Sequence, residues 1–115
     1  MRNKLHRTGI SLATLLLAAT FTLPSAFAAA KVYTGEVSDA MCGAKHQMGS
    51  AAECTKACVQ HGSKYALVVG DKVYTLDTKD KTSMSKLNDL AGKTASVKGT
   101  ATGDTIAVSS VMAAK

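Results

Sequence analysis

The alternation of apolar and polar positions along the chain predicts a small, mainly β domain with two helices. Alternating segments bounded by glycines and polar turns indicate strands, which we expect at residues 32–38, 64–69, 72–77, 93–101 and 105–111. Apolar residues at helical spacing indicate helices at residues 51–60 and 79–91. The predicted order is strand, helix, strand, strand, helix, strand, strand.

Capping residues set the expected limits of both helices. Ser50 and Glu53 have the spacing of a capping box before the first helix, and Gly62 follows its end. The candidate N-cap of the second helix is Thr82 or Ser83. These signals place each helix between two strands.

Two glycine positions add information about the strands. The pair Gly70-Asp71 separates two strand segments and suits a two-residue turn of type II′. Gly35 lies inside the first strand segment, where glycine indicates a bulge or the close approach of another backbone. The second and third strands are therefore expected to form a hairpin.

This order of elements is typical of a five-stranded OB-like barrel with a short helix between strands 3 and 4. Residues 39–62 then form an insertion after strand 1 that contains the first helix. Residues 87–99 resemble the helix end and fourth strand of small bacterial OB-fold proteins, with Ala95 where a branched residue is commoner. The alternative is a generic small β-barrel or sandwich with one helix.

The first 28 residues have the three parts of a cleavable secretory signal. Basic residues come first, an apolar run covers residues 10–23, and Ala26-Phe27-Ala28 is a small-x-small cleavage site. The run is shorter than the roughly 20 residues that span a bilayer, although an uncleaved anchor is the alternative. We expect a periplasmic or secreted protein, residues 29–115, that forms one domain without stable membrane association.

The charge of the chain gives no sign of a nucleic-acid partner. The net charge is +6, but three basic and no acidic residues lie in the signal, so residues 29–115 carry +3. The lysines are scattered, and the aromatic residues of this part are Tyr33, Tyr65 and Tyr74. A single-strand-binding OB-fold needs a basic groove with stacking aromatics, so we expect no nucleic-acid binding.

The expected insertion contains every cysteine of the chain and both histidines that follow the signal. Cys54 and Cys58 are four residues apart on the predicted helix, and His61 is three further on, so all three project from one face. Cys42 and His46 come from the loop before the helix. Such clustering indicates a metal site, provided that the loop and helix fold back on one another.

The donor set selects thiophilic metals. Cys42, Cys54 and Cys58 with His46 would give the three thiolates and one imidazole of a tetrahedral zinc site, and His61 is a further candidate ligand. The same thiolates with the thioether of Met41 or Met48 would suit Cu(I). Asp39 is a candidate outer-shell partner that orients a ligand histidine.

A disulfide is the alternative use of the same cysteines. Cys42 bonded to Cys54 or Cys58 would pin the insertion and make the protein a structural or interaction domain without metal. A bridge between Cys54 and Cys58 is less suited, because their Cβ vectors on a helix do not converge. An enzyme with a reactive thiol is not expected, since no Asn or Asp is placed by the sequence to orient a histidine.

Three segments together resemble a group of small exported bacterial proteins. They are residues 33–46, 54–59 and 64–68, which follow the patterns G-x-V-x-D-x-x-C-x-x-x-H, C-T-x-x-C-V and Y-x-L-V ahead of an OB-like C-terminal half. The resemblance covers nearly all of residues 29–115. It implies export and a distinctive site at Asp39, Cys42, His46, Cys54 and Cys58, whereas His61 lies outside the matched pattern.

Overall fold

The computed structural model describes residues 29–47 and 49–115. It contains five strands and two helices in the predicted order: β1 (Lys31–Asp39), α1 (Ala51–Gln60), β2 (Tyr65–Val69), β3 (Lys72–Asp77), α2 (Lys81–Asp89), β4 (Thr94–Thr102) and β5 (Thr105–Ala113). The mainly β class is therefore confirmed. The expected signal, residues 1–28, and the candidate ligand Met48 lie outside the described residues. Within them, no helix is long and apolar enough to cross a bilayer.

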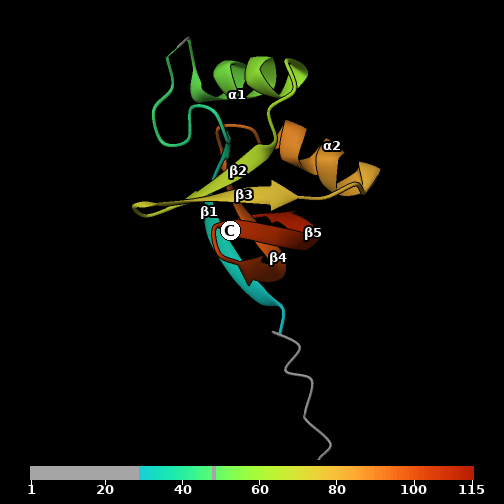
Figure 1. Ribbon diagram of the computed structural model, residues 1–115. Helices are drawn as coiled ribbons and strands as arrows, with labels where there is room; N and C mark the ends of the chain where they lie inside the picture. Colours follow the sequence, from blue (N-terminus) through green and yellow to red (C-terminus); the bar gives the residue numbers. More distant parts are fainter. Residues whose placement is uncertain (1–28, 48) are drawn as a thin grey trace, which may run out of the picture.

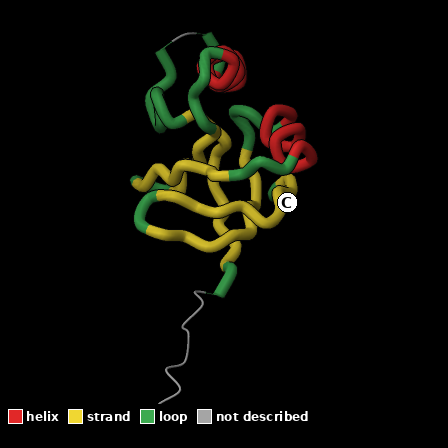
Figure 2. Tube along the Cα trace, turned by 45° about the vertical axis from the view of Figure 1, so that its right-hand side comes forward, coloured by secondary structure: helices red, strands yellow, loops and turns green. Residues whose placement is uncertain are grey.

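The five strands form one mixed sheet in the order β1-β2-β3-β5-β4. The sheet closes on itself because β1 pairs with β4 as well as with β2. All neighbours are antiparallel except β3 and β5, which are parallel. Figures 1 and 2 show both helices on the same side of this closed sheet, with α1 above β2 and α2 beside it.

Gly35 lies close to the point where β1 changes its pairing partner from β4 to β2. Residues 31–36 pair with β4, and residues 36–39 pair with β2. A Cβ atom at Gly35 would collide with the backbone carbonyl of Val68 on β2. The predicted close approach of another backbone at Gly35 is confirmed.

The core lies inside the closed sheet and beneath α2. Its largest fully buried side chains come from four strands and one helix: Val37, Leu67, Leu87, Val97, Ile106 and Val111. Leu87 fixes α2 against the sheet, and α2 packs mainly on β5. Helix α1 adds only Cys54 and Thr55 to the buried set, and it packs mainly on β1. The sheet and α2 therefore form the apolar core, whereas α1 lies above it.

The predicted hairpin turn is confirmed, whereas the predicted N-cap of α2 is wrong. Gly70 has a φ of +58° and Asp71 does not have a positive φ, as a type II′ turn requires. Asp80, rather than Thr82 or Ser83, caps α2, and its side chain accepts a hydrogen bond from Ser83 N. Ser83 is instead buried inside the first turn. An aspartate three residues ahead of a buried serine is the better cap, because its carboxylate reaches the free N–H groups.

The predicted capping box of α1 is confirmed. The Ser50 hydroxyl accepts from Glu53 N at 3.2 Å, and the Glu53 carboxylate accepts from Ser50 N at 3.1 Å. We expect Ser50→Ala to lower the free energy of unfolding by about 1 kcal/mol, measured by chemical denaturation. The exposed helical Ser85→Ala is the matched control, and an equal effect of both would contradict the capping role.

Candidate metal centre

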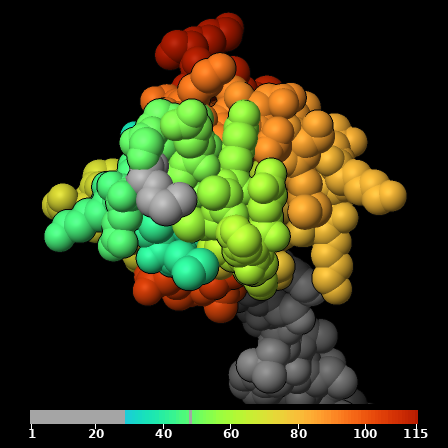
Figure 3. All heavy atoms as spheres, turned by 90° about the horizontal axis from the view of Figure 1, so that it is seen from above, coloured from blue at the N-terminus to red at the C-terminus, as the bar shows by residue number. Residues whose placement is uncertain are grey.

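Three neighbouring elements bring the site together at one end of the closed sheet. Asp39 is the last residue of β1, Cys42 lies in the turn that follows, and Cys54 and Cys58 lie on α1. Seen from above, the insertion and α2 lie side by side on this face (Figure 3). The predicted folding back of the loop onto the helix is therefore present.

The start of α1 is held by a glycine of the main fold. Gly92 has a φ of +74°, and a Cβ atom built on it would lie 2.6 Å from the backbone nitrogen of Ala52. Its own N–H donates to Val37 O at 2.8 Å. The turn before β4 therefore contacts β1 and α1 at once, which fixes the height of α1 above the sheet.

The side chains of Asp39, Cys42, Cys54 and Cys58 converge on one point. Their ligand atoms, one carboxylate oxygen and three sulfurs, all lie within 4.8 Å of one another. The Cys42 Sγ is 3.6 Å from that of Cys54 and 3.8 Å from that of Cys58. A tetrahedral metal ion with bonds of about 2.0 to 2.3 Å needs ligand atoms at such separations.

The two carboxylate oxygens of Asp39 differ in their hydrogen bonding. Its Oδ2 accepts from the backbone N–H groups of Met41 and Cys42, both at 3.0 Å, which sets the position of the cysteine. Its Oδ1 is buried and has no hydrogen-bond partner among the described residues, although the residue is 0% exposed. A buried carboxylate oxygen without a donor is costly unless a cation balances it. This atom is therefore the natural fourth ligand.

The sequence analysis made Asp39 a weaker candidate at the metal site, as an outer-shell partner, and the resemblance placed it within the distinctive site. The D-x-x-C spacing at the end of a strand carried the missing signal, because an aspartate there can accept from the backbone N–H groups two and three residues further on and so turn the chain. That turn brings the carboxylate beside the Cys42 thiol. The spacing alone does not show that the second oxygen would be left without a donor.

The electrostatics of the cluster favour neutral thiols over thiolates until a cation binds. Hydrogen bonding with Cys54 and burial raise the pKa of Cys42 above its ordinary value. Burial, hydrogen bonding with Cys42 and the charge of Asp39 raise the pKa of Cys58 to about 12. Such thiols are poor nucleophiles at neutral pH, whereas a coordinated metal ion deprotonates its thiol ligands outright.

His46 lies beside the cluster and is not one of the four converging groups. Its Nε2 atom is 3.1 Å from the Glu36 carboxylate, and its Nδ1 atom is buried without a hydrogen-bond partner among the described residues. Burial lowers the pKa of His46, but its neighbours Cys54 and Glu36 raise it to above the ordinary value. His46 therefore contacts Glu36 and the Cys54 side of the cluster, whereas the group that converges with the three cysteines is Asp39.

Two further candidate ligands, His61 and Met41, are exposed. His61 is the exposed C-cap residue of α1 and is not among the converging groups. Met41 is 73% exposed, although it adjoins Cys42 in the chain. The sequence-based candidates that do converge are therefore the three cysteines and Asp39.

No disulfide joins the cysteines in the described structure, which includes all three of them. The sulfur separations of 3.6 and 3.8 Å are well beyond the bond length of about 2.05 Å. The arrangement supports the metal alternative of the sequence analysis and not the disulfide staple.

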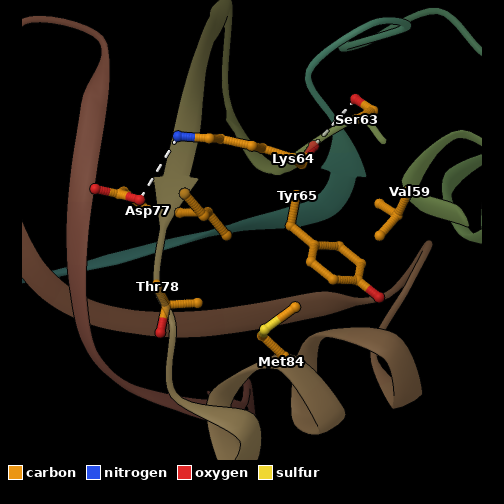
Figure 4. A pocket seen from close by; sticks show the side chains of 8 residues that line it. Val59, Ser63, Lys64, Tyr65, Asp77, Thr78 and Met84 are labelled. Atoms are coloured by element: carbon orange, nitrogen blue, oxygen red, sulfur yellow. Dashed lines mark hydrogen bonds and ion pairs between the residues drawn. The ribbon is translucent and has the colours of Figure 1, made fainter. Parts of the chain in front are cut away.

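A small pocket of about 110 Å³ lies between α1, α2 and the β2–β3 hairpin (Figure 4). Val59, Tyr65 and Met84 line it, and an ion pair of 3.6 Å between Lys64 and Asp77 closes one side. None of the four cluster residues lines this pocket.

Comparison of the chain with protein-family models, curated proteins and solved structures found no match. The function is accordingly inferred from the chemistry of the cluster itself.

Proposed function

We propose that the protein is a binding module that holds one thiophilic metal ion through Cys42, Cys54, Cys58 and Asp39. The observation that carries the proposal is the convergence of a carboxylate oxygen of buried Asp39 with three sulfurs, all within 4.8 Å of one another. The Oδ1 atom of this carboxylate also lacks a hydrogen-bond donor among the described residues. A cation at the centre would bond to all four groups and satisfy this oxygen.

Zinc is the metal that this donor set favours. Three thiolates and one carboxylate oxygen supply the four ligands of a closed tetrahedral zinc site. Cu(I) prefers sulfur ligands alone and would leave the Asp39 oxygen unsatisfied. Copper bound by the three thiolates is therefore the second candidate, and the role of Asp39 distinguishes the two.

A structural or storage role for the metal fits better than catalysis. A catalytic zinc keeps one position open for water or substrate, whereas the four groups here fill a tetrahedron. The raised pKa values of Cys42 and Cys58 disfavour a nucleophilic thiol as well. The proposed function is accordingly metal binding rather than turnover.

The wider setting of the site is part of the same proposal. The strand order β1-β2-β3-β5-β4, with a helix between β3 and β4, supports an OB-like barrel. The composition of residues 1–28 supports export, so that the domain would act in the periplasm or as a secreted protein. We expect no nucleic-acid partner.

Titration of the reduced protein with Co(II) and then Zn(II), under anaerobic conditions, tests the proposal. We expect one ion per chain, with thiolate-to-cobalt charge-transfer absorption that zinc abolishes. His61→Ala is the matched control, because this exposed histidine is not in the cluster, and it should bind as the wild type does. A fully reduced, folded protein that takes up neither metal would refute the proposed function.

A further inference from the structure

Cys42 contacts both of the other thiols, which gives it a special place in the cluster. Its sulfur is 3.6 Å from that of Cys54 and 3.8 Å from that of Cys58. Closing either separation to the disulfide length of about 2.05 Å requires a movement of less than about 2 Å. Because Cys42 lies in a turn, outside any helix or strand, a small rearrangement of the turn can supply this movement.

The remaining pair, Cys54 and Cys58, is poorly placed for a bond. These residues are four apart on the regular helix α1. Side chains at that spacing extend nearly parallel, and their Cα atoms are about 6 Å apart, near the upper part of the disulfide range. Bonding them would distort the helix that Ser50 and Glu53 cap.

We propose that the site has two mutually exclusive states, a metal-bound state and an oxidised state with one disulfide that always includes Cys42. This inference rests on the proposed function, because it assigns a second state to the same three sulfurs. A disulfide consumes two of the three thiolate ligands. Asp39 and one remaining thiol cannot complete a tetrahedral site, so oxidation releases the metal and bound metal protects the thiols.

The oxidant is a low-molecular-weight disulfide such as oxidised glutathione. Cys42 is partly exposed, and its thiolate, a minor species because the pKa is raised, attacks one sulfur of this compound, forms a mixed disulfide and releases the first small thiol. Cys54 or Cys58 then attacks the Cys42 sulfur and releases the second. Two protein thiols are oxidised, the small disulfide is reduced to two thiols, and the protons of the protein thiols end on the released products.

Both states keep the insertion in the same place. A metal ion or a disulfide through Cys42 links the turn after β1 to α1 in either case. The proposal therefore predicts a change in metal affinity without a change of fold, and the far-ultraviolet circular dichroism of the two states should coincide.

Thiol counting in the purified metal-free protein and in three Cys→Ser variants tests the pairing. After treatment with oxidised glutathione, the wild type should fall from three thiols to one. Cys54→Ser and Cys58→Ser should each fall from two to none, whereas Cys42→Ser should keep both of its thiols. Loss of both thiols in monomeric Cys42→Ser, without the added mass of bound glutathione, would overturn the proposal, because it would show a bond between Cys54 and Cys58.

Two further measurements keep the test decisive. Peptide mapping of the oxidised wild type should find Cys42 in every bridge, which covers the case in which a serine variant does not fold. Zinc-loaded protein should lose its thiols at least tenfold more slowly than metal-free protein, and equal rates would contradict mutual exclusion. A wild type that binds no metal would refute the proposed function, whereas the pairing experiment would still decide which cysteines bond.

Discussion

Asp39→Asn is expected to lower zinc affinity more than 100-fold while it leaves the fold intact. The amide oxygen can still accept from the backbone N–H groups of Met41 and Cys42, as Oδ2 does at 3.0 Å. The amide NH₂ group then replaces Oδ1, the oxygen without a donor, and it cannot bind a cation. The expected loss exceeds the 10- to 100-fold effect of a lost outer-shell partner, because a ligand is removed. Competition with a chelator of known affinity measures it.

Two other variants show whether a loss of zinc affinity in Asp39→Asn comes from the lost negative charge or from the lost ligand. Asp77→Asn removes a carboxylate that pairs with Lys64 away from the cluster, so its zinc affinity should stay within twofold of the wild type. Asp39→Ala removes the acceptor for both backbone groups too, and it should weaken both zinc binding and folding. If Asp39→Asn bound zinc as tightly as Asp77→Asn, the carboxylate would not be a ligand and a site of three thiolates would be favoured.

Gly35→Ala is expected to lower the free energy of unfolding by about 3 kcal/mol, the upper part of the range for an overpacked position. The added Cβ would collide with the carbonyl of Val68, a backbone atom held in the β1–β2 ladder. The strand would have to move away from β2 just before Asp39. Urea denaturation at fixed pH gives the difference in free energy.

Gly103→Ala provides the control for this prediction. Gly103 has a φ of +60° in the β4–β5 turn, and a Cβ atom there would have no neighbour within 4 Å. Its cost should be the backbone strain alone, about 1 kcal/mol. Equal destabilisation by both substitutions would show that the close approach at Gly35 is relaxed at little cost.

The elements of the fold could be predicted from the sequence because local signals agreed with one another. Ser50 and Glu53 fixed the start of α1, and Gly70 with Asp71 fixed the hairpin turn, since each signal acts within a few residues. The cap of α2 was mispredicted because Asp80, Thr82 and Ser83 are all good capping residues. Burial of Ser83 in the folded protein settles the choice in favour of Asp80.

The composition of the site could be predicted in part. Clustering of the cysteines in one insertion pointed to a shared centre, and the cluster in the structure contains all three. The fourth group was assigned to His46 from its spacing to Cys42, but the converging group is Asp39, and His46 Nε2 lies 3.1 Å from the Glu36 carboxylate. Glu36 lies on β1, ten residues before His46, so no local pattern reveals this contact.

Asp39 shows why the fourth ligand required the structure. Its neighbours in the sequence explain the turn that it caps, but two of the sulfurs that converge with its carboxylate come from α1, which packs on β1. That packing in turn depends on Gly92, which allows the start of α1 to lie against the turn before β4. A residue distant in sequence thus decides whether the carboxylate meets the sulfurs or the solvent.

The most direct test of the metal centre is X-ray absorption spectroscopy of the zinc-loaded, reduced protein at the zinc edge. The proposed site predicts three sulfur ligands at about 2.3 Å and one oxygen or nitrogen ligand at about 2.0 Å, the latter lost or replaced in Asp39→Asn. A first shell of oxygen and nitrogen alone would show that the three thiols of the insertion do not hold the ion, and it would contradict the proposed centre.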